Sequence, residues 1–249
     1  LSNFSAVELG TIALEGALSK IDLDRNIIDE LIIGHVLQSG CGQSPAKQIA
    51  VKSKLNSEIP CTSINKVCSS GMKAIGLAAQ SIQLGINDVV ISGGMESMSN
   101  APHFMNLRKP QKYGDSQILD SLMVDGLTDF LSKESMGKLA DNCSINYNIS
   151  RESQDNYAIS SYNRSLISTE NGFFKKEIIP VSYINKKGEK ILINEDEEIR
   201  KVDFKKISQL KPAFSKNGTA TAANSSPISD GASILILMNK QKAIDLMIE

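Results

Sequence analysis

A single cysteine, Cys68, stands in the sequence where a thiol could act as a nucleophile. It lies in INKVCSSGMKA (residues 64–74), where a β-branched, strand-like segment meets the start of a helical pattern. The thiolate is the reactive form of cysteine, and the amide dipoles at a helix N-terminus stabilise that anion. Ser69, Ser70 and Gly71 follow directly and leave room for a substrate. The pattern indicates covalent catalysis at Cys68 or, about equally, a buried structural cysteine.

Two further segments are rich in small residues that let a ligand approach the backbone. DVVISGGMESMSNAPHF (88–104) runs from an apolar strand into two glycines, near the strand ends where the sites of α/β folds gather. In NGTATAANSSPISDGAS (217–233), Ser226 and backbone groups are able to bond to the amides of an extended ligand. The alternatives are an ordinary glycine turn and a flexible surface loop. Taken alone, each pattern favours its alternative.

Composition and charge exclude several classes of partner. The 27 basic and 28 acidic residues leave a net charge of −1, which gives no reason to expect nucleic acid or an anionic membrane. The basic cluster KVDFKK (201–206) is a candidate phosphate-binding segment, although such a cluster is also typical of a solvated surface. The four cysteines and two histidines lack the spacing of zinc ligands, so no structural zinc site is expected. A chain of 249 residues needs no disulfide framework, which favours a reducing compartment.

No segment of the sequence reads as a membrane span or a targeting peptide. The longest apolar runs, such as ILILM near residue 234, are far too short to cross a bilayer. The sequence begins with Leu1 and shows no signal or transit peptide. We therefore expect no membrane partner.

Alternation of helical and strand-like patterns through residue 94 predicts a layered α/β core. The expected helices are 5–20, 46–55 and 70–85, the last of them ended by Gly85. The expected strands are 29–38, 61–67, 88–94 and 232–238, of which the last two are expected to be buried. Residues 95–134 show little periodicity, and after them we expect helices at 135–147 and 151–168, the second with Ser150 as its N-cap. A hairpin is expected within 178–203, with its turn at Lys187-Gly188. The predicted domains are an α/β core, formed by residues 1–97 and 228–249, and an inserted α+β lobe, formed by residues 98–227.

In their order and spacing, these segments resemble the thiolases, and among them most closely the acetyl-CoA acetyltransferases. INKVCSSGMKA is similar to the nucleophile segment of that family, and GGMESMSNAP to the strand and turn that follow it. DGLTD (125–129), SMGKLADN (135–142) and TAANSS (221–226) are similar to its acyl-CoA loop domain. The resemblance covers nearly the whole chain. It implies a layered α/β N-terminal half, with a mixed sheet and covering helices, and a CoA-binding lobe.

The resemblance implies covalent catalysis in which Cys68 is acetylated by acetyl-CoA, in a reversible reaction that forms acetoacetyl-CoA and CoA. Coenzyme A would be part of the substrate, and no organic prosthetic group is implied. The positions that correspond to the pantetheine channel are Leu127, Met136, Phe214 and Ala222, and a pantetheine-contacting serine corresponds to Ser226. Further CoA-contacting positions of the mitochondrial-type enzymes correspond to Tyr162, Lys201, Val202, Asp203 and Lys206.

In that mitochondrial-type subgroup a potassium ion also orders the CoA loop. Its ligand positions correspond to Tyr162, Ala222, Ala223 and Ser225. Family members are homo-oligomers, so the resemblance implies a dimer or tetramer. It also points to a mitochondrial location, with the cytoplasm as the alternative.

The sequence departs from the family at its two ends and at one site position. Family members carry a second α/β half with a His in GHP, an Asn in NEAF and a second Cys in CxG, which build oxyanion holes and move protons. None of these motifs occurs here, and the family's first strand is missing as well, so we expect a thiolase truncated at both ends. Ser135 stands where many members have His. The alternatives are a non-catalytic half that binds CoA or a partner subunit and, more distantly, a ketoacyl synthase.

Overall fold

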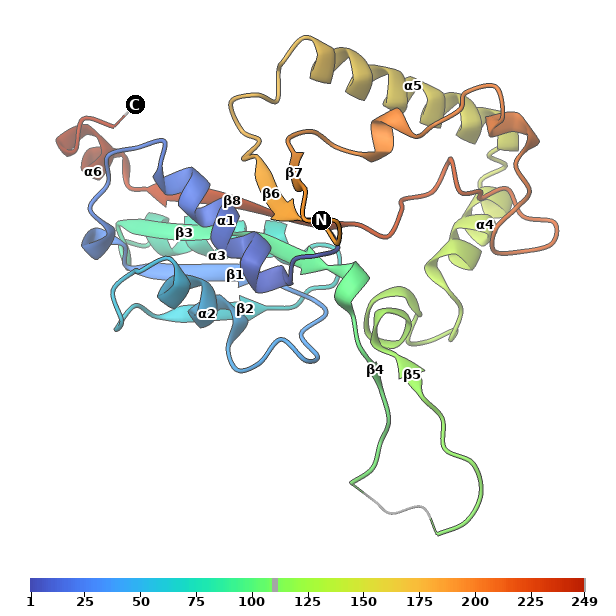
Figure 1. The fold of residues 1–249 in the computed structure, drawn as a ribbon, viewed down its shortest axis with the longest axis horizontal. Coiled ribbons are helices and arrows are strands. Elements are labelled where there is room, and N and C mark those ends of the chain that lie inside the picture. The colour runs from blue at the N-terminus through green and yellow to red at the C-terminus, as the bar shows by residue number, and fades with distance from the viewer. Residues whose placement is uncertain (109–111, 249) are drawn as a thin grey trace. The chain divides into compact units, whose positions relative to one another are not determined.

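The chain folds into two compact units in a computed structural model that describes residues 1–108 and 112–248 (Figure 1). Unit 1 comprises Leu1–Gly126 and Ser229–Glu249, and unit 2 comprises Leu127–Ile228. The first boundary between the two units thus falls after Gly126, whereas the sequence pattern predicted that the inserted lobe begins at residue 98. The reason is that the segment after residue 97 is tied to unit 1: Ser99 donates from N and Oγ to the Asp230 carboxylate at 2.9 and 2.7 Å.

Unit 1 contains the four-stranded mixed sheet that the resemblance implied. Its strand order is β2 (Cys61–Ile64), β1 (Glu30–Gly34), β3 (Val89–Ser97) and β8 (Asp230–Met238). β1 is parallel to both of its neighbours, and β8 is antiparallel to β3. The prediction that residues 232–238 are a buried strand is wrong in part, because β8 is an edge strand and Leu235 is 49% exposed.

Side chains of the sheet point alternately to two faces, and each face packs against different helices. On one face, α1 (Ala6–Leu18) and α2 (Pro45–Lys52) form the main core with Leu31, Ile33, Val89 and Ile91. On the other face, α3 (Ser70–Gln83) packs Ala74 and Ala78 against Ile32 and Val90. The expected helices and strands up to residue 94 are all present, with ends that differ by a few residues.

Local sequence signals account for where several helices begin and end. Ser5 and Glu8 form a reciprocal capping box at the start of α1. Pro45 occupies the first turn of α2, where its missing N–H has no helical partner to lose. Gly85, with a φ of +68°, follows the end of α3 as expected.

Unit 2 is built from two helices and a hairpin. Its elements are α4 (Met136–Asn146), α5 (Arg151–Glu170), β6 (Val181–Ile184) and β7 (Lys190–Ile193). The predicted hairpin is confirmed, and Gly188 takes the positive φ of +81° that its turn requires. The predicted cap at Ser150 is also confirmed, since its side chain accepts a hydrogen bond from the Ser153 N–H. Ser135 does the same for α4, which gives it a structural role at the position where the resemblance showed a departure.

Short elements complete the fold. The segment without periodicity contains the paired strands β4 (His103–Phe104) and β5 (Leu119–Asp120) and the π-helical turn η3 (Leu122–Leu127). The remaining elements are α6 (Lys240–Asp245) and the 3₁₀ turns η1 (Arg25–Ile27), η2 (Met98–Asn100), η4 (Glu198–Arg200) and η5 (Ile207–Gln209). Within residues 1–108 and 112–248, no helix has the length and apolar character needed to cross a membrane.

Candidate active site

Cys68 lies in the turn that joins β2 to α3, and its side chain is exposed. Ser69 is the N-cap of α3, so the thiol immediately precedes the first turn of a 14-residue helix. The N–H groups of a first helical turn point away from the helix and attract negative charge. The expected position at a strand-to-helix turn is confirmed, and the thiol is exposed in the chain described. Its catalytic role remains a prediction.

The turn is held in a strained backbone conformation directly before the cysteine. Val67 has a φ of +48°, which is costly for a β-branched residue. Ser70, only 4% exposed, stabilises this turn: its Oγ accepts from the Lys66 N–H at 2.8 Å and donates to the Val67 carbonyl at 2.6 Å. Asn65 Oδ1 accepts from the Val67 N–H at 2.9 Å. The sequence analysis treated Ser70 only as a small residue and missed this clamp.

Gly34 lets the start of α3 lie directly on the end of β1. A Cβ built at this position would lie 2.3 Å from the Ser70 carbonyl carbon and from the Gly71 nitrogen. Such atoms belong to the main chain and cannot rotate away. The glycine therefore fixes where the first turn of α3, and the cysteine before it, stand relative to the sheet.

The other cysteines of the chain differ from Cys68 in their surroundings. Cys41 and Cys61 are half-buried, and burial raises the pKa of both thiols. The negative charge of Glu96 further raises the pKa of Cys41. These two cysteines are thus held in the thiol form. Cys143 is exposed on α4 and offers a matched comparison for Cys68.

Buried His35 and half-buried Glu96, neither of which the sequence pattern singled out, lie at the ends of β1 and β3. The Glu96 carboxylate accepts hydrogen bonds from the N–H groups of Val36 and Leu37 at 3.0 and 3.2 Å. His35 is 1% exposed, and its Nε2 lies 3.4 Å from Glu96 Oε1. Glu96 stands two residues after Gly94, and the predicted glycine turn is wrong, because β3 runs through both glycines to Ser97. Nothing local in the sequence showed that Glu96 fixes the chain after β1.

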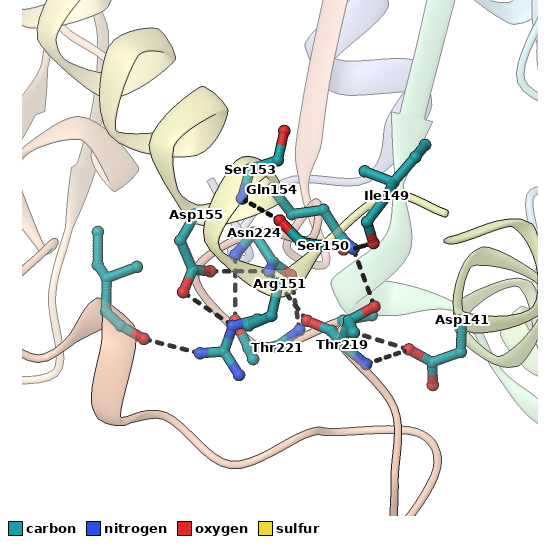
Figure 2. A network of polar contacts seen from close by, with 12 residues as sticks. Asp141, Ile149, Ser150, Arg151, Ser153, Gln154, Asp155, Thr219, Thr221 and Asn224 are labelled. Carbon is teal, nitrogen blue, oxygen red and sulfur yellow. Dashed lines mark hydrogen bonds and ion pairs between the residues drawn. The ribbon is translucent and has the colours of Figure 1, made fainter. Parts of the chain in front are cut away.

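In unit 2, the small-residue loop at 219–226 is held from α4 by a buried carboxylate (Figure 2). Asp141, 2% exposed, accepts from the N–H groups of Thr219 and Ala220 at 2.8 and 2.9 Å. Burial alone would raise the pKa of Asp141, but these amides and the Ser215 hydroxyl outweigh burial, and the pKa lies below its ordinary value. Gly218 has no room for a side chain, because a Cβ would lie 2.2 Å from Asp141 Oδ2.

The sign of this pKa shift predicts how Asp141 stabilises unit 2. A lowered pKa means that stabilisation is complete above pH 3.8, the ordinary value, and is lost as the pH falls through the lower native pKa. We expect Asp141→Asn to reduce the free energy of unfolding at pH 7 by about 1–3 kcal/mol, because a neutral amide accepts more weakly from the two N–H groups. Below pH 3.8 the difference should shrink. Urea unfolding at both pH values is the measurement, and superimposed curves at pH 7 would contradict the assignment.

The same loop is also held from α5, by Asp155 (Figure 2). Asn224 Nδ2 donates to Asp155 Oδ1 at 2.9 Å and to the Thr219 carbonyl at 3.1 Å, while Asn224 Oδ1 accepts from the Thr221 N–H. Thr221 is completely buried. The alternative of a flexible surface loop is therefore wrong for residues 219–224.

The residues expected to line a pantetheine channel are distributed over the described part of unit 2. Met136 and Phe214 are 40% and 45% exposed, and the Phe214 ring packs against Gly137, the neighbour of Met136. Ala222 and Ser226 are exposed on the loop, and Leu127 is half-buried at the end of η3. The structure thus places the Phe214 ring against the residue that follows Met136. It leaves the role of all five positions as a prediction.

The basic segment after η4 also carries acidic partners. Lys201 Nζ lies 2.8 Å from Glu198, and Lys206 Nζ lies 3.1 Å from Asp203. Its hydrogen bond to Glu198 raises the pKa of Lys201. Val202 lies between them and is half-buried. A phosphate that binds here would have to replace these exposed ion pairs, which stabilise little in water.

The expected potassium ligands fit a hard monovalent cation by chemistry, since a phenol oxygen, a serine and backbone carbonyls supply only oxygen. Tyr162 lies on the same face of α5 as Asp155, two turns further on. Its ring packs edge-on against Phe204, with 6.3 Å between the two ring centroids. Ala222 is exposed, Ala223 is 8% exposed and Ser225 is half-buried. No group of three or more His, Cys, Asp or Glu residues suitable for a metal occurs among the described residues.

Comparison with known proteins gives one consistent result. Residues 1–241 match the family described as thiolase, N-terminal domain. The mitochondrial acetyl-CoA acetyltransferase of Homo sapiens is 46% identical over 98% of this chain and 57% of its own length. The cytosolic acetyl-CoA acetyltransferase of Gibberella zeae is 42% identical over 99% of this chain and 62% of its own length. The crystal structure of a thiolase from Ascaris suum in complex with coenzyme A superposes with a TM-score of 0.93 at 39% identity, covering all of this chain and 64% of that one.

Proposed function

Since this chain belongs to the thiolase family, we propose that it forms part of an acetyl-CoA C-acetyltransferase. The proposed reaction joins two molecules of acetyl-CoA to acetoacetyl-CoA and CoA, reversibly, through an acetyl group held on Cys68. The observation that carries the proposal is the exposed thiol on a strained, clamped turn before α3. Relatives named acetyl-CoA acetyltransferase, at 42–46% identity, support the choice of substrate. The chain spans less than two thirds of each relative, so activity is proposed for the protein to which it belongs.

The proposed chemistry divides a condensation into two acyl transfers. In the first, the Cys68 thiolate attacks the thioester carbonyl, the bond from that carbon to the CoA sulfur breaks, and CoA leaves as a thiolate that takes up a proton. In the second, the methyl carbon of another acetyl-CoA gives up a proton, which balances the one taken up by CoA, and attacks the acetyl-cysteine. A carbon–carbon bond forms, and the Cys68 thiolate leaves. The clamped turn holds the backbone before Cys68 in one conformation throughout, which favours both attacks.

For coenzyme A, we propose the sites that the resemblance implied in unit 2. The pantetheine arm would lie along Leu127, Met136, Phe214 and Ala222, with Ser226 as a polar contact. The phosphate-bearing end would contact Tyr162, Lys201, Val202, Asp203 and Lys206. The exposure of Met136, Phe214 and Ser226 supports this assignment, as does the coenzyme A complex of the Ascaris thiolase.

The experiment that tests the proposal is intact-mass spectrometry of the purified chain after mixing with acetyl-CoA, with acetoacetyl-CoA assayed in the same sample. An added acetyl group together with product would support the full activity. An acetyl group without product would support the first transfer alone. A chain that binds CoA without becoming acetylated would support the alternative, a non-catalytic CoA-binding half. The absence of an acetyl group from the full-length protein as well would contradict the proposal.

We further propose a potassium ion beside the CoA loop, held by Tyr162, Ala222, Ala223 and Ser225. We expect CoA to bind more tightly in a potassium buffer than in a sodium buffer. Tyr162→Phe should remove most of that difference, because it deletes one oxygen ligand and leaves the aromatic packing on Phe204 in place. Isothermal titration calorimetry in the two buffers is the measurement. Equal affinities in the parent protein would contradict the potassium site.

By the same reasoning we propose a homodimer or homotetramer, located in mitochondria or, as the alternative, in the cytosol. The support for the two locations is that relatives include a mitochondrial and a cytosolic enzyme. Gel filtration with light scattering tests the oligomer, and fluorescence imaging of the full-length protein tests the location.

A further inference from the structure

Asp155 on α5 is a buried carboxylate whose two oxygens are bonded to groups that belong to different parts of unit 2. It is 5% exposed. Its Oδ1 accepts from Asn224 Nδ2 at 2.9 Å, and its Oδ2 accepts from Arg151 Nε at 2.8 Å (Figure 2). A charge buried to this extent persists only when it is paired and hydrogen-bonded. Both partners are therefore fixed in orientation by the same carboxylate.

One partner fixes the small-residue loop. Because a carboxylate only accepts hydrogen bonds, the Asn224 amide must present its NH₂ group to Asp155 and its oxygen to the loop. That oxygen accepts from the Thr221 N–H, and the NH₂ group also donates to the Thr219 carbonyl. Asp155 thus selects the single orientation of Asn224 that closes the turn, and the exposed Ala222 lies within that turn.

The other partner fixes the end of the basic segment. The Arg151 guanidinium, oriented through its Nε by Asp155, donates from Nη2 to the Ile207 carbonyl at 2.9 Å. Ile207 is 1% exposed and directly follows Lys206. Arg151 therefore anchors the C-terminal end of the segment 201–206, and the planar fork of arginine is needed to bond to both groups at once.

We propose that Asp155 is a positioning residue that holds both the 219–224 loop and the 201–207 segment in one fixed geometry, and so couples the pantetheine contacts of a bound CoA to its phosphate contacts. The coupling to CoA rests on the proposed function, whereas the holding of both segments does not. Asp141 is the natural contrast, since its partners Thr219, Ala220 and Ser215 all lie outside the 201–207 segment.

The first test needs no ligand. Asp155→Asn places an NH₂ group opposite either Arg151 or Asn224, so one of the two bonds must break, and the neutral amide oxygen accepts more weakly in the other. We expect amide hydrogen exchange in this variant to be faster in both 201–207 and 219–224. In Asp141→Asn it should be faster in the loop alone. The matched control is Glu152→Gln, which removes an exposed carboxylate from the same helix and should change neither segment. Faster exchange in one segment only, or in neither, for Asp155→Asn would overturn the proposal.

The second test measures binding of CoA and of pantetheine by calorimetry. Asp155→Asn should lower the affinity for CoA by about tenfold, which is within the usual range for coupled sites. It should also lower the ratio of the affinity for CoA to the affinity for pantetheine. Arg151→Lys, a milder change, should lower that ratio with little effect on pantetheine. An unchanged ratio in both variants would refute the coupling. If the parent chain bound no CoA, the proposed function would fail while the exchange experiment still decided the role of Asp155.

Discussion

Replacing Cys68 with alanine should abolish covalent acetylation by acetyl-CoA completely. Alanine has no group that can form a bond to the acetyl carbon, so no acyl-enzyme can accumulate. In the protein to which this chain belongs, turnover should fall by roughly 10⁴- to 10⁶-fold, as when other covalent enzymes lose their nucleophile. The measurement is intact-mass spectrometry after incubation with acetyl-CoA, followed by peptide mapping of any adduct.

The matched control is Cys143→Ala, which removes the exposed thiol of α4 and should leave acetylation unchanged. Because Cys68 is exposed, its replacement leaves no cavity, and the melting temperatures of the two variants should agree with the parent. An adduct that persists in Cys68→Ala would place the acetyl group on another residue and would contradict the mechanism. Loss of the adduct in both variants would indicate that removing either thiol impairs the protein, and would not identify Cys68 as the nucleophile.

Adding one methyl group at Gly34 should displace the first turn of α3 and so distort the turn that carries Cys68. The Cβ of Gly34→Ala would lie 2.3 Å from main-chain atoms of Ser70 and Gly71, so α3 or β1 must shift. Overpacking of this kind typically costs about 1–3 kcal/mol, and the shift would also loosen the Ser70 clamp on Val67. We expect a lower melting temperature and a lower rate of reaction of Cys68 with acetyl-CoA and with iodoacetamide.

The control for this prediction is Gly76→Ala in the middle of α3. A Cβ there meets no atom within 4 Å, and alanine favours a helix over glycine by about 0.5–1 kcal/mol. Gly76→Ala should therefore keep the reactivity of Cys68 and raise the melting temperature slightly. If Gly34→Ala behaved in the same way, the close approach of α3 to β1 would have no bearing on the nucleophile.

The sequence predicted much of the secondary structure because its signals are local. Helical periodicity, the cap at Ser150, and the turn glycines Gly85 and Gly188 each act within a few residues. The same signals placed Cys68 at the junction of β2 and α3. They failed for β8, because the composition of an apolar strand does not show whether a neighbour covers both of its faces.

The sequence by itself determined the order of the elements, the position of the candidate nucleophile and the resemblance to thiolases. Only the tertiary structure decided what holds the site residues in place. The Ser70 clamp required a positive φ at Val67 that no residue preference predicts. The bonds from Asp141 to Thr219 and from Asp155 to Asn224 join residues 78 and 69 positions apart. Contacts across such separations leave no periodic trace in the chain, since they depend on how whole helices and loops pack in space.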